Sequence, residues 1–150
     1  KELGNKFLLS GADYSVNMIK QARRNLKIKD IEAELFNTDI IDIKENIAED
    51  FDIITCTHSL PYYKNQEKAL SDMADLLKEK GYIIVICASV NNFYDRLTCS
   101  LLKLTTGKAH YPSIKELKSF AKDKLRFMGS CRIKKAFFIP NIVAVVYKRK

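Results

Sequence analysis

The stretch from Lys6 to Leu26 constrains the fold most, because it joins a strand pattern directly to a helix pattern. Its first part, Lys6–Ala12, contains the apolar run Phe7-Leu8-Leu9 and predicts a short buried strand. An amphipathic helix follows, and Ser15 is its expected N-cap because the hydroxyl can accept a hydrogen bond from a first-turn backbone N–H. Asp13 is therefore expected at the carboxyl end of a strand, where open α/β sheets bind ligands.

The carboxylate of Asp13 permits two interpretations. Its two oxygens could accept both hydroxyl protons of a ribose, which suits a nucleoside ligand. Alternatively, Asp13 only helps to cap the helix that follows it. The local sequence leaves both interpretations open.

The strand-then-helix alternation continues along the chain. Strands are predicted over Ile31–Asn37, Phe51–Cys56 and Tyr82–Ala88. Between the last two, Asn65 caps a helix that is expected to end over Lys78 to Gly81, with Gly81 at the turn.

The second half of the chain predicts two more helices and a hairpin. Asn91 is expected to cap a helix with an apolar face, and Ser113–Glu116 is a capping box that opens another helix. Arg126–Ile139 and Asn141–Lys148, separated by Pro140, predict an antiparallel hairpin. The helix that Asn91 is expected to cap has an apolar face of four residues: Phe93, Leu97, Leu101 and Leu104. We therefore expect residues 1–150 to form one α/β domain with three layers.

Composition excludes several classes of protein. No apolar run approaches the ~20 residues that span a bilayer, and no signal-peptide pattern opens the chain. The four cysteines, which form no CxxC pair, are expected to be reduced thiols in a cytoplasmic protein without a metal site: Cys56, Cys87, Cys99 and Cys131. The net charge of +8 indicates either a polyanionic partner or a lysine-rich solvated surface. We expect the latter, because no basic stripe with interleaved aromatic residues occurs.

Four segments together resemble one family. GADYSVNMIKQAR, FNTDIIDI, FDIITCTHSLPYY and LLKEKGYIIVI occur in order and at the spacing of class I S-adenosylmethionine-dependent methyltransferases. The resemblance covers most of Leu3 to Ala88 and is strongest to the methyltransferase type 11 group, which includes the ubiquinone/menaquinone C-methyltransferases. Glu79-Lys80 replaces the Pro-Gly that this family usually has before its fifth strand.

The resemblance implies a Rossmann-like methyltransferase fold with strand order 3-2-1-4-5-7-6 and a terminal antiparallel hairpin. It also implies methyl transfer from S-adenosylmethionine to a small-molecule acceptor by in-line nucleophilic displacement. Asp13, with the adjacent Tyr14, would bind the ribose of the cofactor. Asp39 and Ile40 would hold the adenine, and Thr57-His58 would lie at the edge of the cofactor.

The acceptor side is defined less sharply. Methyl transfer from a sulfonium needs alignment more than proton transfer, so His58 is either a general base or a residue that only shapes its loop. The resemblance makes residues 90–126 the expected acceptor pocket or lid. Tyr62, Tyr63 and Tyr111 are the candidate acceptor-binding residues.

The start of the chain departs from the family pattern. Lys1–Asn5 is typical of the last turn of a helix, and no GxGxG pattern occurs, so we expect the family's first strand, first helix and glycine-rich loop to be absent from this sequence. In the family order that strand lies between Lys6–Ala12 and Phe51–Cys56. The gap between these two strands could be closed by their direct pairing, filled by a strand from another chain, or filled by an upstream segment. We favour the upstream segment. Were the sequence complete, we would expect a homodimer or partner and little cofactor affinity.

Two other functions remain open at this point. One is a non-catalytic remnant of the methyltransferase fold that serves binding or assembly. The other is a nucleic-acid methyltransferase, which only the charge suggests, because Ser59-Leu60-Pro61-Tyr62 is a faint match to the NPPY-type motif that holds a flipped base.

Overall fold

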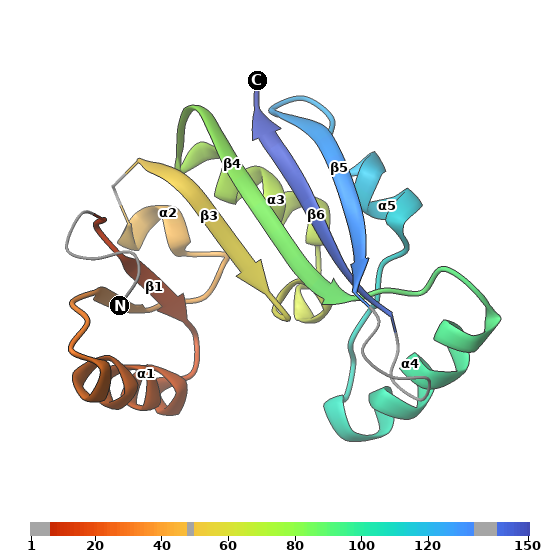
Figure 1. Cartoon of the computed structure of the whole chain (residues 1–150), viewed down its shortest axis with the longest axis horizontal. Coiled ribbons are helices and arrows are strands. Elements are labelled where there is room, and N and C mark those ends of the chain that lie inside the picture. The colour runs from red at the N-terminus through yellow and green to blue at the C-terminus, as the bar shows by residue number, and fades with distance from the viewer. Residues whose placement is uncertain (1–6, 48–49, 134–140) are drawn as a thin grey trace. The chain divides into compact units, whose positions relative to one another are not determined.

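A computed structural model describes residues 7–47, 50–133 and 141–150. The chain divides into two compact units, Lys1–Ala48 and Glu49–Lys150 (Figure 1). The expectation that residues 1–150 form one domain stays a prediction.

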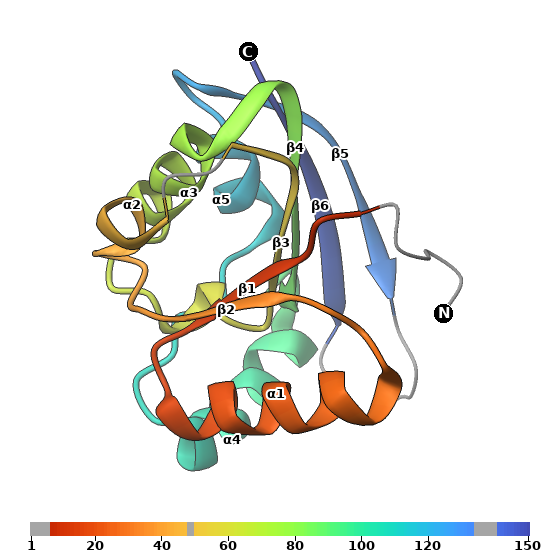
Figure 2. The ribbon, with the colours of Figure 1, turned by 90° about the vertical axis from the view of Figure 1, so that its left-hand side faces the viewer.

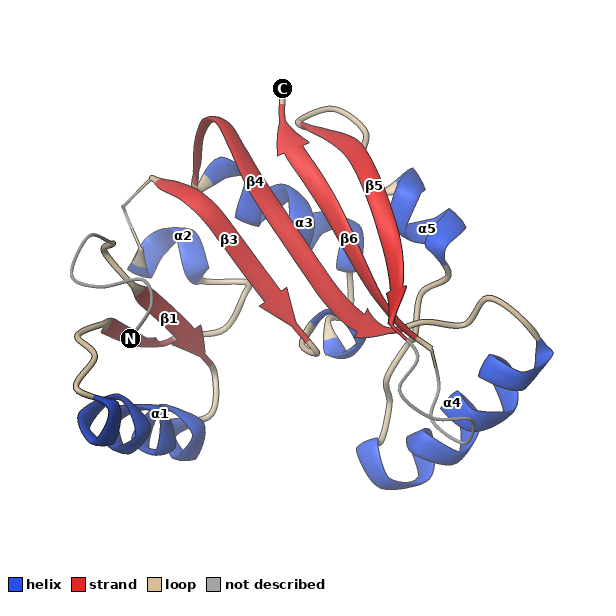
Figure 3. Cartoon of the chain, viewed as in Figure 1, coloured by secondary structure: helices blue, strands red, loops and turns tan. Residues whose placement is uncertain are grey.

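Within its described residues, the first unit contains one two-stranded sheet and two helices, and Figure 3 draws its strands in red and its helices in blue. Strand β1 (Ser10–Asp13) leads into helix α1 (Val16–Lys29), and strand β2 (Glu34–Asn37) leads into the short helix α2 (Ile43–Asn46). The two strands are parallel, as a strand–helix–strand crossover requires.

Helix α1 begins where the sequence predicted. The Ser15 hydroxyl accepts a hydrogen bond from the backbone N–H of Met18 at 3.4 Å. The helix ends at Asp30, which adopts the left-handed conformation with φ 53° and donates its N–H to carbonyls of the last turn. The sequence pattern predicts one apolar side for this helix, and of its members only Ile19 is buried, whereas Val16 and Met18 are exposed: Val16, Met18, Ile19, Ala22 and Leu26.

The strand predicted over Lys6–Ala12 is shorter than expected. Phe7-Leu8-Leu9 lies outside β1, Leu8 is 98% exposed, and Lys6 lies outside the described residues. The ladder cannot extend further back because Ile31 already donates its N–H to a carbonyl of the last turn of α1. The partner strand β2 therefore starts at Glu34, and the Glu34 N–H donates to the Leu9 carbonyl at 2.9 Å beside the first register pair, Ser10 and Glu34.

The second unit contains the larger sheet, and its strand order is β3-β4-β6-β5. Strands β3 (Phe51–Thr57) and β4 (Leu77–Ala88) are parallel, while β5 (Leu125–Ile133) and β6 (Ile142–Arg149) form the predicted antiparallel hairpin. Part of the predicted hairpin, residues 134–140 with Pro140, lies outside the described residues. The helical elements are η2 (Leu60–Tyr62), α3 (Gln66–Asp75), α4 (Phe93–Thr106) and α5 (Ile114–Ser119).

The strand orders of the two sheets reproduce the expected order without its first strand. Among the described residues β1 has β2 as its only strand neighbour, and β3 has β4. In the expected order 3-2-1-4-5-7-6, these are the two strands that flank strand one. The predicted α/β class and Rossmann-like topology are confirmed.

The core of the second unit lies between its sheet and helices α3 and α5, which cover one face of the sheet (Figure 2). Alternate residues of the central strands point into this core and are fully buried, among them Ile83, Val85, Val143, Val145 and Tyr147. The Tyr147 hydroxyl donates to the carbonyl of Leu117 at 2.7 Å, which joins β6 to α5. The capping box at Ser113 and Glu116 is confirmed and fixes where α5 begins.

The boundary between α3 and β4 differs from the prediction. The helix ends at Asp75, and Leu77 is already a strand residue that pairs with Phe51 and is completely buried. Helical periodicity had assigned Leu77 to the helix, but its pairing with Phe51 makes it part of β4. The left-handed residue is Lys80, with φ 66°, rather than Gly81. Gly81 is required for another reason, since a Cβ there would lie 3.0 Å from the carbonyl oxygen of Lys78.

Helix α4 differs from the prediction in its N-cap and in which of its sides is buried. Asn92, rather than Asn91, is its N-cap. The four residues predicted to be buried are exposed, from 52% at Leu97 to 83% at Phe93: Phe93, Leu97, Leu101 and Leu104. The buried side of the helix instead contains Asp95 and Cys99.

The carboxylate of Asp95 explains this orientation. Asp95 is fully buried, and its Oδ1 accepts from the Asn141 side-chain amide at 2.7 Å. Its Oδ2 accepts from the Asn91 backbone N–H at 3.1 Å. Burying a carboxylate without such donors would cost several kcal/mol, so the helix turns the side that satisfies Asp95 toward the core.

No helix within the described residues is long and apolar enough to cross a membrane.

We expect Asp95→Ala to lower the free energy of unfolding by about 2–3 kcal/mol, because it leaves the Asn141 amide and the Asn91 N–H without an acceptor. Chemical denaturation of the purified protein measures this change. Asp123→Ala, which removes an exposed carboxylate from the same unit, should change stability by less than about 0.5 kcal/mol. Equal effects of the two substitutions would contradict this role for Asp95.

Candidate functional site

In the first unit, β1 and β2 end side by side with Asp13 paired to Asn37 in the strand register. The Oδ1 atom of Asp13 accepts from the backbone N–H of Ser15 at 2.8 Å. The Asn37 side-chain amide donates to the carbonyls of both Asp13 and Tyr14, each at 2.9 Å. Asn37 therefore fixes the loop that presents Asp13, a role that sequence reasoning missed although an amide at a strand end was a visible signal.

The Asp13 carboxylate fits a diol ligand. It is half-buried, and the hydrogen bond from Ser15 engages only one of its two oxygens among the described residues. The capping interpretation and the ligand interpretation are therefore compatible, because the other oxygen remains available as an acceptor.

Asp39 and Ile40 follow β2 after one residue, Thr38, and lie at the same sheet edge as Asp13. The backbone N–H of Thr38 donates to the Asp13 carbonyl at 3.2 Å, which joins the two loops. Asp39 forms a turn in which its Oδ1 accepts from the N–H of Ile41 at 3.3 Å. The expectation that Asp13 and Asp39 follow two adjacent strands is confirmed, while their ligand remains a prediction.

In the second unit, Thr57 ends β3 and His58 follows it in the left-handed conformation, with φ 59°. This conformation costs a non-glycine residue roughly 1 kcal/mol, and it is stabilised here by a 2.7 Å hydrogen bond from the His58 N–H to the Ile86 carbonyl. The His58 side chain is exposed and has no hydrogen-bond partner within the described part of the chain. The role of His58 as a general base stays a prediction.

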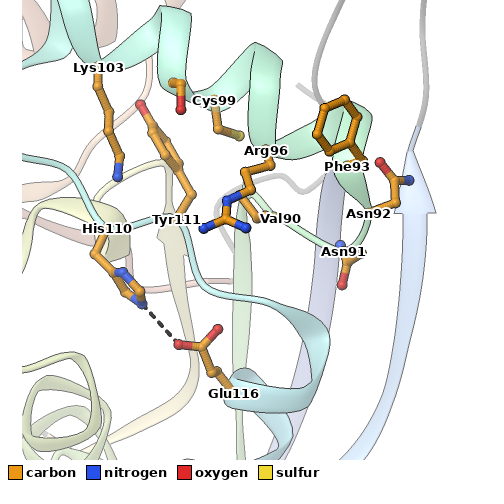
Figure 4. A pocket seen from close by; sticks show the side chains of 11 residues that line it. Val90, Asn91, Asn92, Phe93, Arg96, Cys99, Lys103, His110, Tyr111 and Glu116 are labelled. Carbon is orange, nitrogen blue, oxygen red and sulfur yellow. Dashed lines mark hydrogen bonds and ion pairs between the residues drawn. The ribbon is translucent and has the colours of Figure 1, made fainter.

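A cavity of about 720 Å³ lies beyond the carboxyl end of β4 (Figure 4). All the residues that line it come from positions 90–116, inside the predicted acceptor region. Tyr111 is one of them, whereas Tyr62 and Tyr63 are not. Tyr62 is half exposed on η2, and Tyr63 hydrogen-bonds to the thiol of Cys56.

One wall of the cavity is held by side chains that bind neighbouring backbone. Asn91 accepts from the N–H of Ile114 at 2.9 Å and donates to the Ser89 hydroxyl at 2.9 Å. Ser89 in turn donates to the Pro112 carbonyl at 2.6 Å. These bonds join the segment after β4 to the start of α5, so the two segments that form this wall are held together.

His110 and Glu116 form a pair at this cavity, with His110 Nε2 3.0 Å from Glu116 Oε1. Burial alone would raise the pKa of Glu116. Hydrogen bonds from the Ser113 N–H at 2.8 Å, the Ser113 hydroxyl at 2.7 Å and His110 outweigh it and lower the pKa below its usual value. The Glu116 carboxylate is therefore ionised and fully engaged near neutral pH. The sequence identified this residue only as part of a capping box.

The three buried cysteines of the second unit do not offer a nucleophile. Burial raises the pKa of Cys56 to about 11, that of Cys87 to about 12 and that of Cys99 to about 11. These thiols remain protonated at neutral pH and behave as small apolar side chains. Among the described residues no group of three or more histidine, cysteine or acidic side chains could hold a metal ion.

Several solved structures share this fold. The N-methyltransferase NodS from Bradyrhizobium japonicum, in complex with S-adenosylhomocysteine, is 16% identical with a TM-score of 0.74, and the match covers 95% of this chain and 66% of that one. The magnesium protoporphyrin IX methyltransferase ChlM from Synechocystis, also with bound S-adenosylhomocysteine, is 14% identical with a TM-score of 0.71, covering 95% and 64%.

A third similar structure is an S-adenosylmethionine-dependent methyltransferase from Clostridium acetobutylicum, 17% identical with a TM-score of 0.71, covering 95% of this chain and 75% of that one. The chain thus spans about two thirds of the length of the first two of these enzymes. No curated protein matches the sequence significantly. The model of a methyltransferase domain family, however, matches residues 1–127. The chain belongs to the methyltransferase domain family.

Proposed function

We propose that this protein transfers a methyl group from S-adenosylmethionine to a small-molecule acceptor. Membership of the methyltransferase domain family supports the reaction class. The cofactor is supported by the S-adenosylhomocysteine bound in the NodS and ChlM structures, and a small acceptor by the porphyrin named for ChlM.

The observation that carries the proposal is the half-engaged carboxylate at the end of β1. The Ser15 N–H anchors one oxygen of Asp13, and Asn37 holds the Asp13 and Tyr14 carbonyls, so the carboxylate is positioned before any ligand arrives. In this proposal Asp13 accepts hydrogen bonds from the ribose hydroxyls and Tyr14 lies beside the ribose. Asp39 accepts from the exocyclic amine of adenine, and Ile40 packs on the ring.

When bound, S-adenosylmethionine supplies an electrophilic methyl carbon on its sulfonium. The acceptor attacks that carbon in line, and the residues of the chain contribute mainly by fixing the positions of the two reactants. We assign Thr57 and His58 to the edge of the cofactor. In this proposal His58 shapes the loop beside the cofactor, because methyl transfer from a sulfonium needs alignment more than proton transfer.

The narrower assignment, to the group that includes ubiquinone/menaquinone C-methyltransferases, also belongs to this proposal. It rests on the four ordered segments of the sequence alone, and the solved structures named above neither share nor exclude that activity.

Asp13→Asn tests the proposed cofactor site in the full-length protein. The substitution keeps a side-chain oxygen for the Ser15 N–H but removes the charge from the ribose site. A charge-assisted hydrogen bond contributes about 1.5–3 kcal/mol, so the dissociation constant for S-adenosylhomocysteine should rise roughly 10-fold or more. Titration calorimetry measures this constant.

Asp30→Asn is the matched control. It removes an exposed carboxylate from the same unit, and asparagine readily adopts the left-handed conformation that Asp30 has at the end of α1. Its affinity should equal that of the unsubstituted protein. Unchanged affinity in Asp13→Asn would exclude Asp13 from the site.

A further inference from the structure

Two cationic side chains of the α4 cavity have no role in the proposed cofactor site. Arg96 and Lys103 both line the cavity and are seven residues apart on α4, so they lie on the same side of the helix two turns apart. In Figure 4 both side chains extend from α4 toward the segment that carries His110.

The charges of these two residues are not compensated within the described part of the chain. Neither Arg96 nor Lys103 forms a salt bridge there. Glu116 is the one acidic residue among those lining the cavity, and its carboxylate already accepts hydrogen bonds from Ser113 and His110. A ligand that enters the cavity would therefore meet the positive charges of Arg96 and Lys103. The Glu116 carboxylate already accepts hydrogen bonds through both of its oxygens.

Part of the remaining lining suits an apolar or aromatic ligand body. Val90, Phe93 and Tyr111 contribute apolar and aromatic surface beside the polar Asn92 and Ser100, and the volume of about 720 Å³ lies within the range of small-molecule sites. The hydrogen bonds of Ser89 and Asn91 fix the wall opposite α4, so the cavity is formed before a ligand binds.

We propose that this cavity binds the methyl acceptor and that the acceptor carries an anionic group, a carboxylate or a phosphate, next to an apolar or aromatic body. Arg96 presents a planar fork of N–H donors that matches either anion, and Lys103 adds a second positive charge. The identification of this ligand as the acceptor rests on the proposed methyl transfer. The anion site itself stands on the cavity and its charges.

Titration of the full-length protein with benzoate tests the anion site, with inorganic phosphate as a second probe and benzyl alcohol as the neutral analogue of benzoate. Amide chemical shifts in two-dimensional NMR locate each probe, and ionic strength is held constant with sodium chloride. We expect saturable shifts centred on residues 90–116 with benzoate and at least tenfold weaker binding of benzyl alcohol. Benzoate binding with phosphate failing to bind would assign the site to carboxylates, whereas the converse would assign it to phosphates.

The double variant Arg96→Gln/Lys103→Gln should weaken binding of the anion at least tenfold, since it removes both charge-assisted contacts. Lys20→Gln/Arg23→Gln is the matched control, because it removes the same charge from exposed positions of α1. It should bind like the unsubstituted protein. Arg96→Lys alone should retain part of the affinity, and all three variants should melt at similar temperatures because the substituted side chains are exposed.

Equal weakening by both double variants, equal binding of benzoate and benzyl alcohol, or no saturable shifts with either anion would overturn the anion site. Titration with S-adenosylhomocysteine separates this result from the proposed function. The Arg96→Gln/Lys103→Gln variant should keep its affinity for S-adenosylhomocysteine. A protein that binds benzoate in the cavity but never S-adenosylhomocysteine would retain the anion site and lose the methyl-transfer assignment.

Discussion

The buried carboxylate of Asp95 is the interaction on which the second unit depends. It accepts hydrogen bonds from the Asn141 side chain at the start of β6 and from the Asn91 backbone after β4, and it lies in the first turn of α4. Because a buried polar group needs hydrogen-bond partners, this one residue fixes the rotation of α4 about its axis. With that rotation, Arg96 and Lys103 line the cavity and Phe93 is exposed.

A second constraint is the parallel pairing of strands. Parallel neighbours end at the same edge, so loops that are far apart in the sequence meet there. In the first unit this brings the loop of Asp13 beside that of Asp39, held by Asn37. In the second unit the loop after β3 and the cavity after β4 follow the same rule, and a backbone hydrogen bond from His110 to Pro61 joins them.

Much of this arrangement could be predicted from the sequence, because local rules and tertiary structure agree there. The N-cap at Ser15, the capping box at α5, the terminal hairpin and the α/β class all rest on short-range chemistry that the fold leaves unchanged. Asp13 was found from its place at the end of a strand, and Asp39 from the family resemblance. Their roles toward a cofactor came from family resemblance and remain proposals.

The predictions failed where distant partners decide the structure. Periodicity gave Leu77 to a helix, but pairing with Phe51 makes it a strand residue. Periodicity also placed the apolar residues of α4 in the core, but a distant asparagine satisfies Asp95 and turns them outward. The site role of Arg96 and Lys103 was also missed. Two positive charges two turns apart on a helix usually belong to a solvated surface, and only the tertiary structure places a cavity beside them.

The most direct test of the account is a crystal structure of the full-length protein with S-adenosylhomocysteine. We expect ribose hydroxyls within hydrogen-bond distance of the Asp13 carboxylate and the adenine amine at Asp39. A nucleoside bound away from the ends of β1 and β2, with Asp13 bonded only to the Ser15 N–H, would contradict the assignment of this edge as the cofactor site.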